Sequence, residues 1–271
     1  MIIKGKVFIV TGASSGIGEE LSRQLARRGA FVVCASRNIE KLDRVCSSII
    51  NKGGSAVEVQ TDITDQKQCQ RMVDKAIQTY NKVDGLILNA GISMWAKFDE
   101  IKDVQFFQTI MNTNYLGSVF CVHAALPYLK KSRGMIVSCS TAQAIMGFPN
   151  HSGYVASKHA LHGFLSTIRM ENKEEVTVLE AVLSWIKGTD LRNNSFGVDG
   201  KKQEGVTRKH TKEAIPLAQC VETIITAIEK DLKTVYIPKK LSLIPFLKVF
   251  FNRFLEKKLF LQLMIIKNNV Y

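Results

Sequence analysis

Short apolar segments rich in valine and isoleucine alternate along this chain with segments whose apolar residues recur at helical spacing. Between residues 39 and 52, for example, Leu42, Val45, Ile49 and Ile50 fall on one face of a helix. The apolar segments have the length of buried strands and cover residues 6–10, 31–35, 56–60, 85–89, 134–138, 176–182 and 234–237. This alternation predicts an α/β fold with a doubly wound, seven-stranded parallel sheet that helices cover on both faces.

A glycine-rich segment, TGASSGIG at 11–18, follows the first expected strand and opens the first helix. Gly12, Gly16 and Gly18 would let the backbone approach a pyrophosphate, and the helix N-terminus supplies free N–H groups. A tight turn without a ligand is the alternative interpretation. The position between a strand and a helix favours a dinucleotide site in a Rossmann-type fold.

The second expected strand ends at Ser36 and Arg37, where an acidic residue would select NAD(H) by holding the ribose 2′-hydroxyl. A hydroxyl and a guanidinium suit a 2′-phosphate instead. The sequence therefore favours NADP(H) over NAD(H), with a solvated surface arginine as the alternative.

Tyr154 and Lys158, in YVASK, are spaced so that both lie on one face of a helix. A free phenol has a pKa of about 10 and is a poor proton shuttle near neutrality. A neighbouring ammonium would lower that pKa. A buried aromatic beside a lysine with no chemical role is the alternative.

Together these motifs resemble the short-chain dehydrogenase/reductase family over about residues 4–237. TDIT at 61–64, NAG at 89–91 and NYLG at 114–117 also resemble motifs of that family, in the same order. ALPYLKKSRGMIVS and FLSTIRMEN are similar to the branch that includes 11β-hydroxysteroid dehydrogenase type 1 and other lipid-handling reductases.

The resemblance implies roles for individual residues. Tyr154 would be the general acid or base at the carbonyl, Lys158 would also bind the nicotinamide ribose, and Asn114 would hold a water that links Lys158 to solvent. The implied cofactor-binding residues are Gly12, Ser14, Ser15, Gly16, Ile17, Gly18, Ser36, Arg37, Asp62, Ile63, Asn89, Ala90, Gly91, Tyr154, Lys158, Ile186 and Thr189.

Two positions depart from the family pattern. The substrate-orienting hydroxyl usually stands 13 residues before the tyrosine, which is Thr141, but we favour Ser140 at the end of the fifth strand and keep Thr141 as the alternative. VLSWIKGTDL at 182–191 lacks the usual Pro-Gly, so that Gly188 or Thr189 could occupy the place of the family's threonine near the carboxamide, with Ile186 offering backbone groups.

Composition limits the remaining choices. The 271 residues carry a formal charge of +13, which favours anionic partners but does not choose among them. No platform of basic and aromatic residues for stacking bases stands outside the tail, so we expect no nucleic-acid partner. The histidines and six scattered cysteines show no metal-ligand spacing, and we expect no metal and buried thiols in a reducing compartment.

Residues 239–271 form a separate tail after the expected domain of residues 1–238. Seven basic residues and one acidic residue stand among phenylalanines, leucines and isoleucines at 239–267. These charges interrupt any apolar run of about 20 residues, the length that spans a bilayer. A basic amphipathic helix on a membrane surface and a helix packed on its own domain or a partner subunit remain open.

We therefore expect an NADP(H)-dependent enzyme that interconverts a carbonyl and a secondary alcohol on an apolar, lipid-like substrate. Residues 190–213 would form its substrate lid, and a solvated loop is the alternative. Reduction of a 3-oxoacyl thioester or 3-ketosphingoid base, and a non-catalytic dinucleotide sensor, are alternative functions. We expect a cytoplasmic location with contact to a membrane surface, and the resemblance implies a homodimer or homotetramer.

Overall fold

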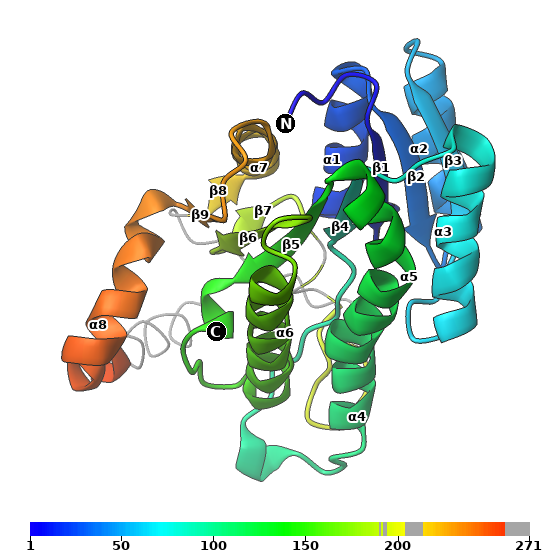
Figure 1. Cartoon of the computed structure of the whole chain (residues 1–271). Helices are drawn as coiled ribbons and strands as arrows, with labels where there is room; N and C mark the ends of the chain where they lie inside the picture. Colours follow the sequence, from blue (N-terminus) through cyan, green and yellow to red (C-terminus); the bar gives the residue numbers. More distant parts are fainter. Residues whose placement is uncertain (190, 192–193, 204–213, 258–271) are drawn as a thin grey trace.

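A single seven-stranded parallel sheet forms the centre of the computed structural model, which describes residues 1–189, 191, 194–203 and 214–257 (Figure 1). Its strand order is β3-β2-β1-β4-β5-β6-β9, and every neighbouring pair is parallel. The strands are β1 (Val7–Thr11), β2 (Phe31–Ser36), β3 (Ser55–Gln60), β4 (Gly85–Leu88), β5 (Met135–Thr141), β6 (Thr177–Leu183) and β9 (Thr234–Ile237). All seven strands expected from the sequence are confirmed, with ends shifted by at most a few residues.

Two short strands, β7 (Ile186–Lys187) and β8 (Ile215–Pro216), pair in parallel outside the main sheet. The sequence does not predict these strands, because two residues are too few to show a periodic pattern.

Helices cover both faces of the sheet, which confirms the doubly wound, Rossmann-type architecture. They are α1 (Gly16–Arg27), α2 (Ile39–Ile50), α3 (Gln66–Tyr80), α4 (Phe106–Met111), α5 (Gly117–Ser132), α6 (Ser152–Glu171), α7 (Leu217–Glu229) and α8 (Ile244–Phe250). Short helical turns are η1 (Phe98–Glu100), η2 (Asn112–Leu116), η3 (Ala142–Ala144) and η4 (Lys239–Leu243). One apolar cluster lies between the sheet and α1, α2 and α7, and a second lies between the sheet and α3, α5 and α6.

The predicted helix at 39–52 is present as α2, and its apolar face is nearly the expected one. Leu42, Val45 and Ile49 are buried against the sheet, whereas Ile50 is 53% exposed at the last position of the helix. Asn38 caps the helix, since its side chain accepts a hydrogen bond from the backbone N–H of Lys41. Ile50 faces solvent because the chain turns away after it towards β3.

All six cysteines are buried and free, as expected from their apolar surroundings. The closest pair is Cys69 on α3 and Cys121 on α5, whose sulfur atoms lie 3.7 Å apart. Burial and the contact with Cys69 raise the pKa of the Cys121 thiol, which keeps it protonated near neutrality.

The tail begins directly after the last strand of the sheet. η4 and α8 follow β9, and residues 252–257 form a further helical segment. Ile244 and Leu255 are buried against Ala142, Met146 and Val182. None of the described helices has both the length and the apolar character needed to cross a bilayer.

Candidate active site

A cavity of about 730 Å³ opens at the carboxyl ends of the strands. It extends across the point between β1 and β4 where the order of the strands in the sheet reverses, the place where ligands bind in open α/β sheets. Residues from the β1–α1 turn, the end of β2, the end of β4, β5 and α6 line it together. One cavity therefore contains groups that are up to 190 positions apart in the sequence, from Gly12 to Lys202.

The turn between β1 and α1 is built so tightly that only glycine fits at two of its positions. Gly12 has φ +66°, in the left-handed region, and a Cβ there would lie 2.9 Å from Nδ2 of Asn89. A Cβ on Gly18 would collide with the backbone carbonyl of Gly12. Gly18 does not line the cavity, and its part is to allow α1 to approach the turn.

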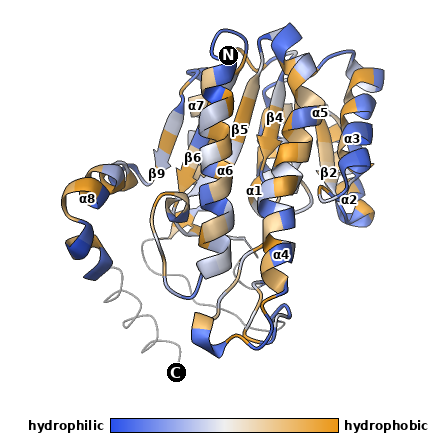
Figure 2. Ribbon diagram, turned by 60° about the horizontal axis from the view of Figure 1, so that its bottom comes forward, coloured by the Kyte–Doolittle hydropathy of each residue, from blue (hydrophilic) through white to orange (hydrophobic). Residues whose placement is uncertain are grey.

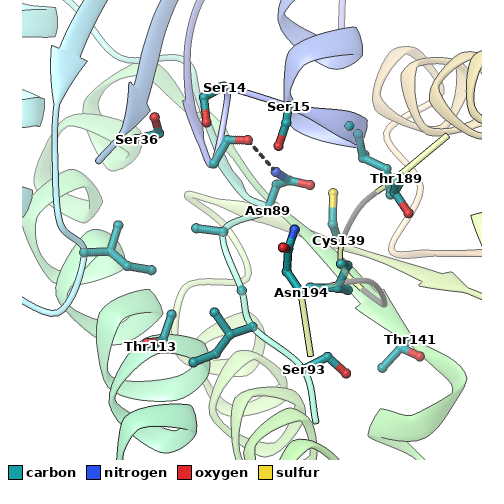
Figure 3. A pocket seen from close by; sticks show the side chains of 18 of the residues that line it. Ser14, Ser15, Ser36, Asn89, Ser93, Thr113, Cys139, Thr141, Thr189 and Asn194 are labelled. Carbon is teal, nitrogen blue, oxygen red and sulfur yellow. Dashed lines mark hydrogen bonds between the residues drawn. The ribbon is translucent and has the colours of Figure 1, made fainter. Parts of the chain in front are cut away.

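Asn89 joins this turn to the end of β4 (Figure 3). Its Nδ2 donates to the carbonyl oxygens of Thr11 at 3.0 Å and Gly12 at 3.2 Å. Its backbone N–H donates to Oγ1 of Thr11 at 3.0 Å. The carboxyl ends of β1 and β4 are thus fixed to each other, which keeps one wall of the cavity in place.

The N-terminus of α1 points at the same cavity. Ser14, Ser15, Gly16 and Ile17 line it, and Ser15 precedes the helix without making a side-chain cap. The first N–H groups of a helix lack intrahelical partners, and the helix dipole favours an anion there. A phosphate group fits this turn, so the residues present can hold the pyrophosphate of a dinucleotide.

Cationic groups gather where β2 ends. Ser36, Arg37, Asn38 and Lys41 all line the cavity, and Arg37 and Lys41 are exposed to solvent. Asp62 is the one acidic residue among the described residues that line it. Its carboxylate accepts hydrogen bonds from the backbone N–H of Thr64 at 2.9 Å and from Oγ1 of Thr64 at 2.8 Å. This end of the cavity is therefore suited to a phosphate.

Tyr154 and Lys158 face the cavity from the first turns of α6, and both side chains are buried. Nζ of Lys158 lies 5.8 Å from the centre of the Tyr154 ring. Burial raises the pKa of the Tyr154 phenol and lowers the pKa of the Lys158 ammonium. The expectation that Lys158 lowers the tyrosine pKa is not met in the protein alone, where removal of the phenol from water raises that pKa.

No acidic side chain pairs with Lys158 among the residues that the structure describes. A buried ammonium without a carboxylate partner is costly, and hydroxyl groups of a bound ligand would reduce that cost. Gly91, at the end of the β4 turn, leaves room beside it, since a Cβ there would lie 3.8 Å from Nζ of Lys158.

Asn114 lies behind the cavity and does not line it. It sits in the π-helical turn η2, is fully buried, and exchanges hydrogen bonds with both backbone groups of Ile92 at 2.9 Å. Its Nδ2 also donates to Oγ of Ser157 at 2.9 Å, between Tyr154 and Lys158 on α6. Its side chain is thus committed to holding the β4 turn against α6, while the predicted water bridge remains a prediction.

Both candidates for the substrate-orienting hydroxyl line the cavity at the end of β5. Oγ1 of Thr141 accepts a hydrogen bond from the backbone N–H of Gln143 at 3.3 Å, so its own proton is still available. Successive residues of a strand point to opposite faces of the sheet. Ser140 shares its face with Ile136, which packs in the cluster that α6 covers. Because both residues nevertheless line the cavity, both hydroxyls remain candidates.

Gln143 was not recognised in the sequence, although its side-chain amide lines the same part of the cavity. The residue is buried, and its Oε1 has no hydrogen-bond partner among the described residues. A lone glutamine after a strand carries no motif that would have marked it in the sequence.

The segment after β6 contributes Leu183, Ser184, Trp185, Ile186 and Thr189 to the cavity. Thr189 lies against the cofactor turn, since a Cβ on Gly16 would be 3.4 Å from its Cγ2, and its Oγ1 donates to the carbonyl oxygen of Ile186 at 3.3 Å. Gly188 has φ +80° and does not line the cavity. Of the two open assignments, the structure thus brings Thr189 to the site and uses Gly188 for the bend.

An apolar cluster packs behind Tyr154, outside the lining of the cavity. Tyr154 packs with Met94, Ala96, Phe106 and Ile110, and the ring of Phe196 stacks on Phe106 with centroids 5.7 Å apart. The backbone of Phe196 exchanges hydrogen bonds with Ser93 at 2.9 Å and Trp95 at 2.8 Å. Phe196 belongs to the predicted lid, of which residues 190, 192–193 and 204–213 lie outside the described residues.

His151 is a further residue whose place the sequence did not reveal, because a lone histidine carries no spacing signal. It lines the cavity, and its ring centre lies 6.2 Å from that of Tyr154 and 4.9 Å from that of Trp95. His210, another of the histidines, lies outside the described residues. Within the described part of the chain, no three His, Cys, Asp or Glu residues gather where they could hold a metal ion.

The structure thus brings nearly all predicted site residues to one cavity. The cavity-lining residues predicted from the sequence are Gly12, Ser14, Ser15, Gly16, Ile17, Ser36, Arg37, Asp62, Ile63, Asn89, Ala90, Gly91, Ser140, Thr141, Tyr154, Lys158, Ile186 and Thr189. Gly18 and Asn114 support it from behind.

Similarities to known proteins agree with this geometry. Residues 6–197 match the family described as short chain dehydrogenase. The chain is 35% identical over 198 residues to 11-beta-hydroxysteroid dehydrogenase 1A of Arabidopsis thaliana, which covers 73% of this chain and 57% of that protein. It is 30% identical over 231 residues to an uncharacterized oxidoreductase of Listeria monocytogenes, which covers 85% of this chain and 93% of that protein.

Among solved structures, the fold is similar to an alcohol dehydrogenase from Thermococcus sibiricus complexed with 5-hydroxy-NADP. The TM-score is 0.73 at 22% identity, with 85% of this chain and 95% of that chain covered. This chain spans less than two thirds of the length of the plant steroid dehydrogenase that it matches. The family match over residues 6–197, together with the order of the strands and the cavity that collects the predicted site residues, shows that the chain belongs to the short-chain dehydrogenase family.

Proposed function

We propose that this protein is an NADP(H)-dependent oxidoreductase that interconverts a carbonyl and a secondary alcohol on an apolar, lipid-like substrate. The observation that carries the proposal is one cavity that holds the glycine turn at one side and the buried Tyr154 and Lys158 at the other. When bound, the nicotinamide cofactor would supply or accept the hydride. The chain itself would bind, orient and exchange the proton.

Tyr154 is suited to donate a proton. Because burial raises the pKa of its phenol, Tyr154 stays protonated at neutral pH, which is the form that can protonate a carbonyl oxygen during reduction. Ser140 or Thr141 would orient that oxygen by a hydrogen bond. Lys158 would hold hydroxyl groups of the cofactor and bring positive charge to the site.

Selection of NADP(H) would depend on the cations at the end of β2. Arg37 and Lys41 line the cavity at this end, and no acidic side chain among the described residues of β2 or the start of α2 lines it with them. Two cations favour a 2′-phosphate, whereas a carboxylate would repel it. The 5-hydroxy-NADP complex of the Thermococcus sibiricus protein is in keeping with this proposal.

An apolar substrate is supported by the apolar side chains that line the cavity, among them Ile92, Trp185 and Leu191. The names of the plant relatives, 11-beta-hydroxysteroid dehydrogenases, point in the same direction. Reduction of a 3-oxoacyl thioester or a 3-ketosphingoid base would use the same residues. A non-catalytic dinucleotide sensor would keep the glycine turn without needing Tyr154.

The test follows oxidation of NADPH and of NADH by the purified protein with steroid, retinal, long-chain ketone and short polar carbonyl substrates. We expect turnover with NADPH and an apolar ketone, and its loss in Tyr154→Phe with NADPH binding retained. Tyr128→Phe on α5 is the matched control, since Tyr128 does not line the cavity. Binding of NADPH without turnover of any substrate would overturn the catalytic proposal in favour of the sensor.

A further inference from the structure

An unusual group of apolar side chains faces solvent on the C-terminal helices. Leu243, Phe246, Val249, Phe250, Phe251 and Phe254 are each between 53% and 74% exposed, and we call this set the aromatic face. The rings of Phe246 and Phe250 lie 4.8 Å apart, and those of Phe246 and Phe251 lie 6.2 Å apart. A contiguous apolar patch of this kind on a protein surface marks an interaction site.

The aromatic face is not the side by which these helices pack on their own domain. Ile244, Leu247 and Leu255 point inwards and join the apolar cluster of Ala142 and Met146. The helices are therefore held in place by one apolar side while a second apolar side remains exposed. Figure 2 shows α8 at the margin of the molecule, with hydrophobic residues along its ribbon. A helix packed on its own domain and a helix on a membrane surface are thus both compatible with the structure, since packing on the domain uses only one side of the helix.

Basic residues border the aromatic face. Lys248, Arg253 and Lys257 are exposed on the same segment, Lys239 and Lys240 precede it, and Glu256 is the one acidic residue between 239 and 257. A protein partner with an apolar surface would not require this excess of positive charge. The surface of a bilayer that contains anionic phospholipids matches both features, because aromatic side chains enter the interfacial region while lysine and arginine meet the headgroups.

The position of the aromatic face relative to the cavity adds a functional reason. The inner side of α8 packs on the segment between β5 and α6, which supplies Gln143 and His151 to the cavity. Phe148 of this segment packs with α8 and also lies 6.5 Å from the ring of Trp185, which lines the cavity. A bilayer in contact with the aromatic face would therefore lie on the same side of the molecule as this wall of the cavity.

We propose that the aromatic face docks this protein on an anionic phospholipid surface, with the phenylalanines in the interface and the flanking cations on the headgroups. The docking does not depend on the proposed oxidoreductase activity. Vesicle binding tests it directly, and turnover of an apolar ketone with NADPH in the absence of vesicles tests the proposed activity in the same preparation, so that failure of either is recognised separately.

The first experiment measures co-sedimentation of the full chain with phosphatidylcholine vesicles that contain or lack phosphatidylglycerol. We expect binding to the anionic vesicles only, weakened by salt, and weakened about tenfold or more by Phe246→Gln with Phe250→Gln. Met170→Gln is the matched control, since Met170 is 71% exposed at the far end of α6 and should leave binding unchanged. Equal sedimentation with and without anionic lipid would overturn the proposal.

A second pair of variants tests the same proposal if the phenylalanine variants fold poorly. Lys248→Glu with Arg253→Glu should weaken binding to anionic vesicles about tenfold or more, since each cation near such a surface contributes about 1 kcal/mol. Lys67→Glu with Lys75→Glu, on the exposed side of α3, should not. The proposal fails if the full chain does not bind vesicles and instead forms a dimer that the phenylalanine substitutions dissociate. The aromatic face would then be an interface between two copies of the chain.

Discussion

The side-chain amide of Asn114 bonds to both backbone groups of Ile92, accepting from its N–H and donating to its carbonyl oxygen, each at 2.9 Å. A π-helical turn places the amide there, and its remaining N–H reaches Oγ of Ser157 at 2.9 Å. The hydroxyl group of Ser157 in turn donates to the carbonyl oxygen of Tyr154 at 2.8 Å. One fully buried side chain thus connects the β4 turn with the helix that carries Tyr154 and Lys158.

Asn114→Ala should therefore lower both stability and activity. It leaves the half-buried N–H and carbonyl of Ile92 without their partner, which costs about 1–2 kcal/mol of unfolding free energy. Urea unfolding followed by circular dichroism measures this change. Asn112→Ala, in the same π-helical turn but without a side-chain hydrogen bond to Ile92, is the control. An Asn114→Ala protein as stable as the control would show that the clamp contributes nothing.

Arg37→Ala combined with Lys41→Ala should change cofactor preference more than it changes the chemical step. Loss of two cations beside the expected 2′-phosphate should raise KM for NADPH by about tenfold to a hundredfold and leave KM for NADH nearly unchanged. Steady-state kinetics with each cofactor measure both values. Arg44→Ala, an exposed arginine further along α2 outside the cavity, is the control. Equal effects on NADPH and NADH would contradict the assignment.

Gln143→Leu should narrow the range of substrates. The side chain of Gln143 lines the cavity and can form a hydrogen bond with a hydroxyl group of the substrate, and loss of such a bond costs about 1–3 kcal/mol. We expect kcat/KM to fall about tenfold for hydroxylated ketones and to stay the same or rise for ketones without a second polar group. A uniform loss for both groups of ketones would mean that Gln143 supports the fold and does not select the substrate.

The pair of His162 and Glu180 should make stability depend on pH. Nδ1 of His162 lies 3.0 Å from both carboxylate oxygens of the buried Glu180, and this hydrogen bond raises the pKa of the imidazole. A raised pKa in the folded state means that the pair stabilises the protein fully below the unfolded pKa of about 6.5. That stabilisation is lost as the pH rises through the folded pKa.

His162→Gln should thus cost most in acid and little at alkaline pH. Because the His162 side chain is 40% exposed and solvent screens it, we expect a loss under about 1 kcal/mol at pH 6 that fades above pH 8. Thermal unfolding from pH 5.5 to 9 measures the difference from the unsubstituted protein. His123→Gln, at an exposed position on α5, should show no such trend. A loss that grows with rising pH would contradict the sign of the shift.

The strands and the cofactor turn could be predicted because their signals are local. Seven apolar segments became the seven strands of the sheet, since buried parallel strands need apolar residues on both faces. Gly12 and Gly18 were recognisable because no side chain fits where the backbone of the turn and α1 meet. The spacing of Tyr154 and Lys158 fixed their common face on α6 for the same local reason.

Several members of the site carry no local signal. Lys41, Gln143 and His151 reach the cavity only because α2, η3 and the start of α6 converge on the ends of the strands. The part that Asn114 plays could not be deduced either, because its partner Ile92 is 22 residues away and follows a different strand. Such contacts arise when separate elements pack, and spacing along the chain does not encode them.

By itself, then, the sequence determined the sheet, the position of the cofactor turn and the residues of the tyrosine–lysine pair, because each depends on interactions between residues close together in the chain. The tertiary structure alone decided which neighbouring side chains share the cavity, that burial raises the Tyr154 pKa, and that α8 buries Ile244 while exposing Phe246, Phe250 and Phe254. The physical reason is that desolvation and exposure depend on everything packed around a side chain, and residues distant in sequence supply most of those neighbours.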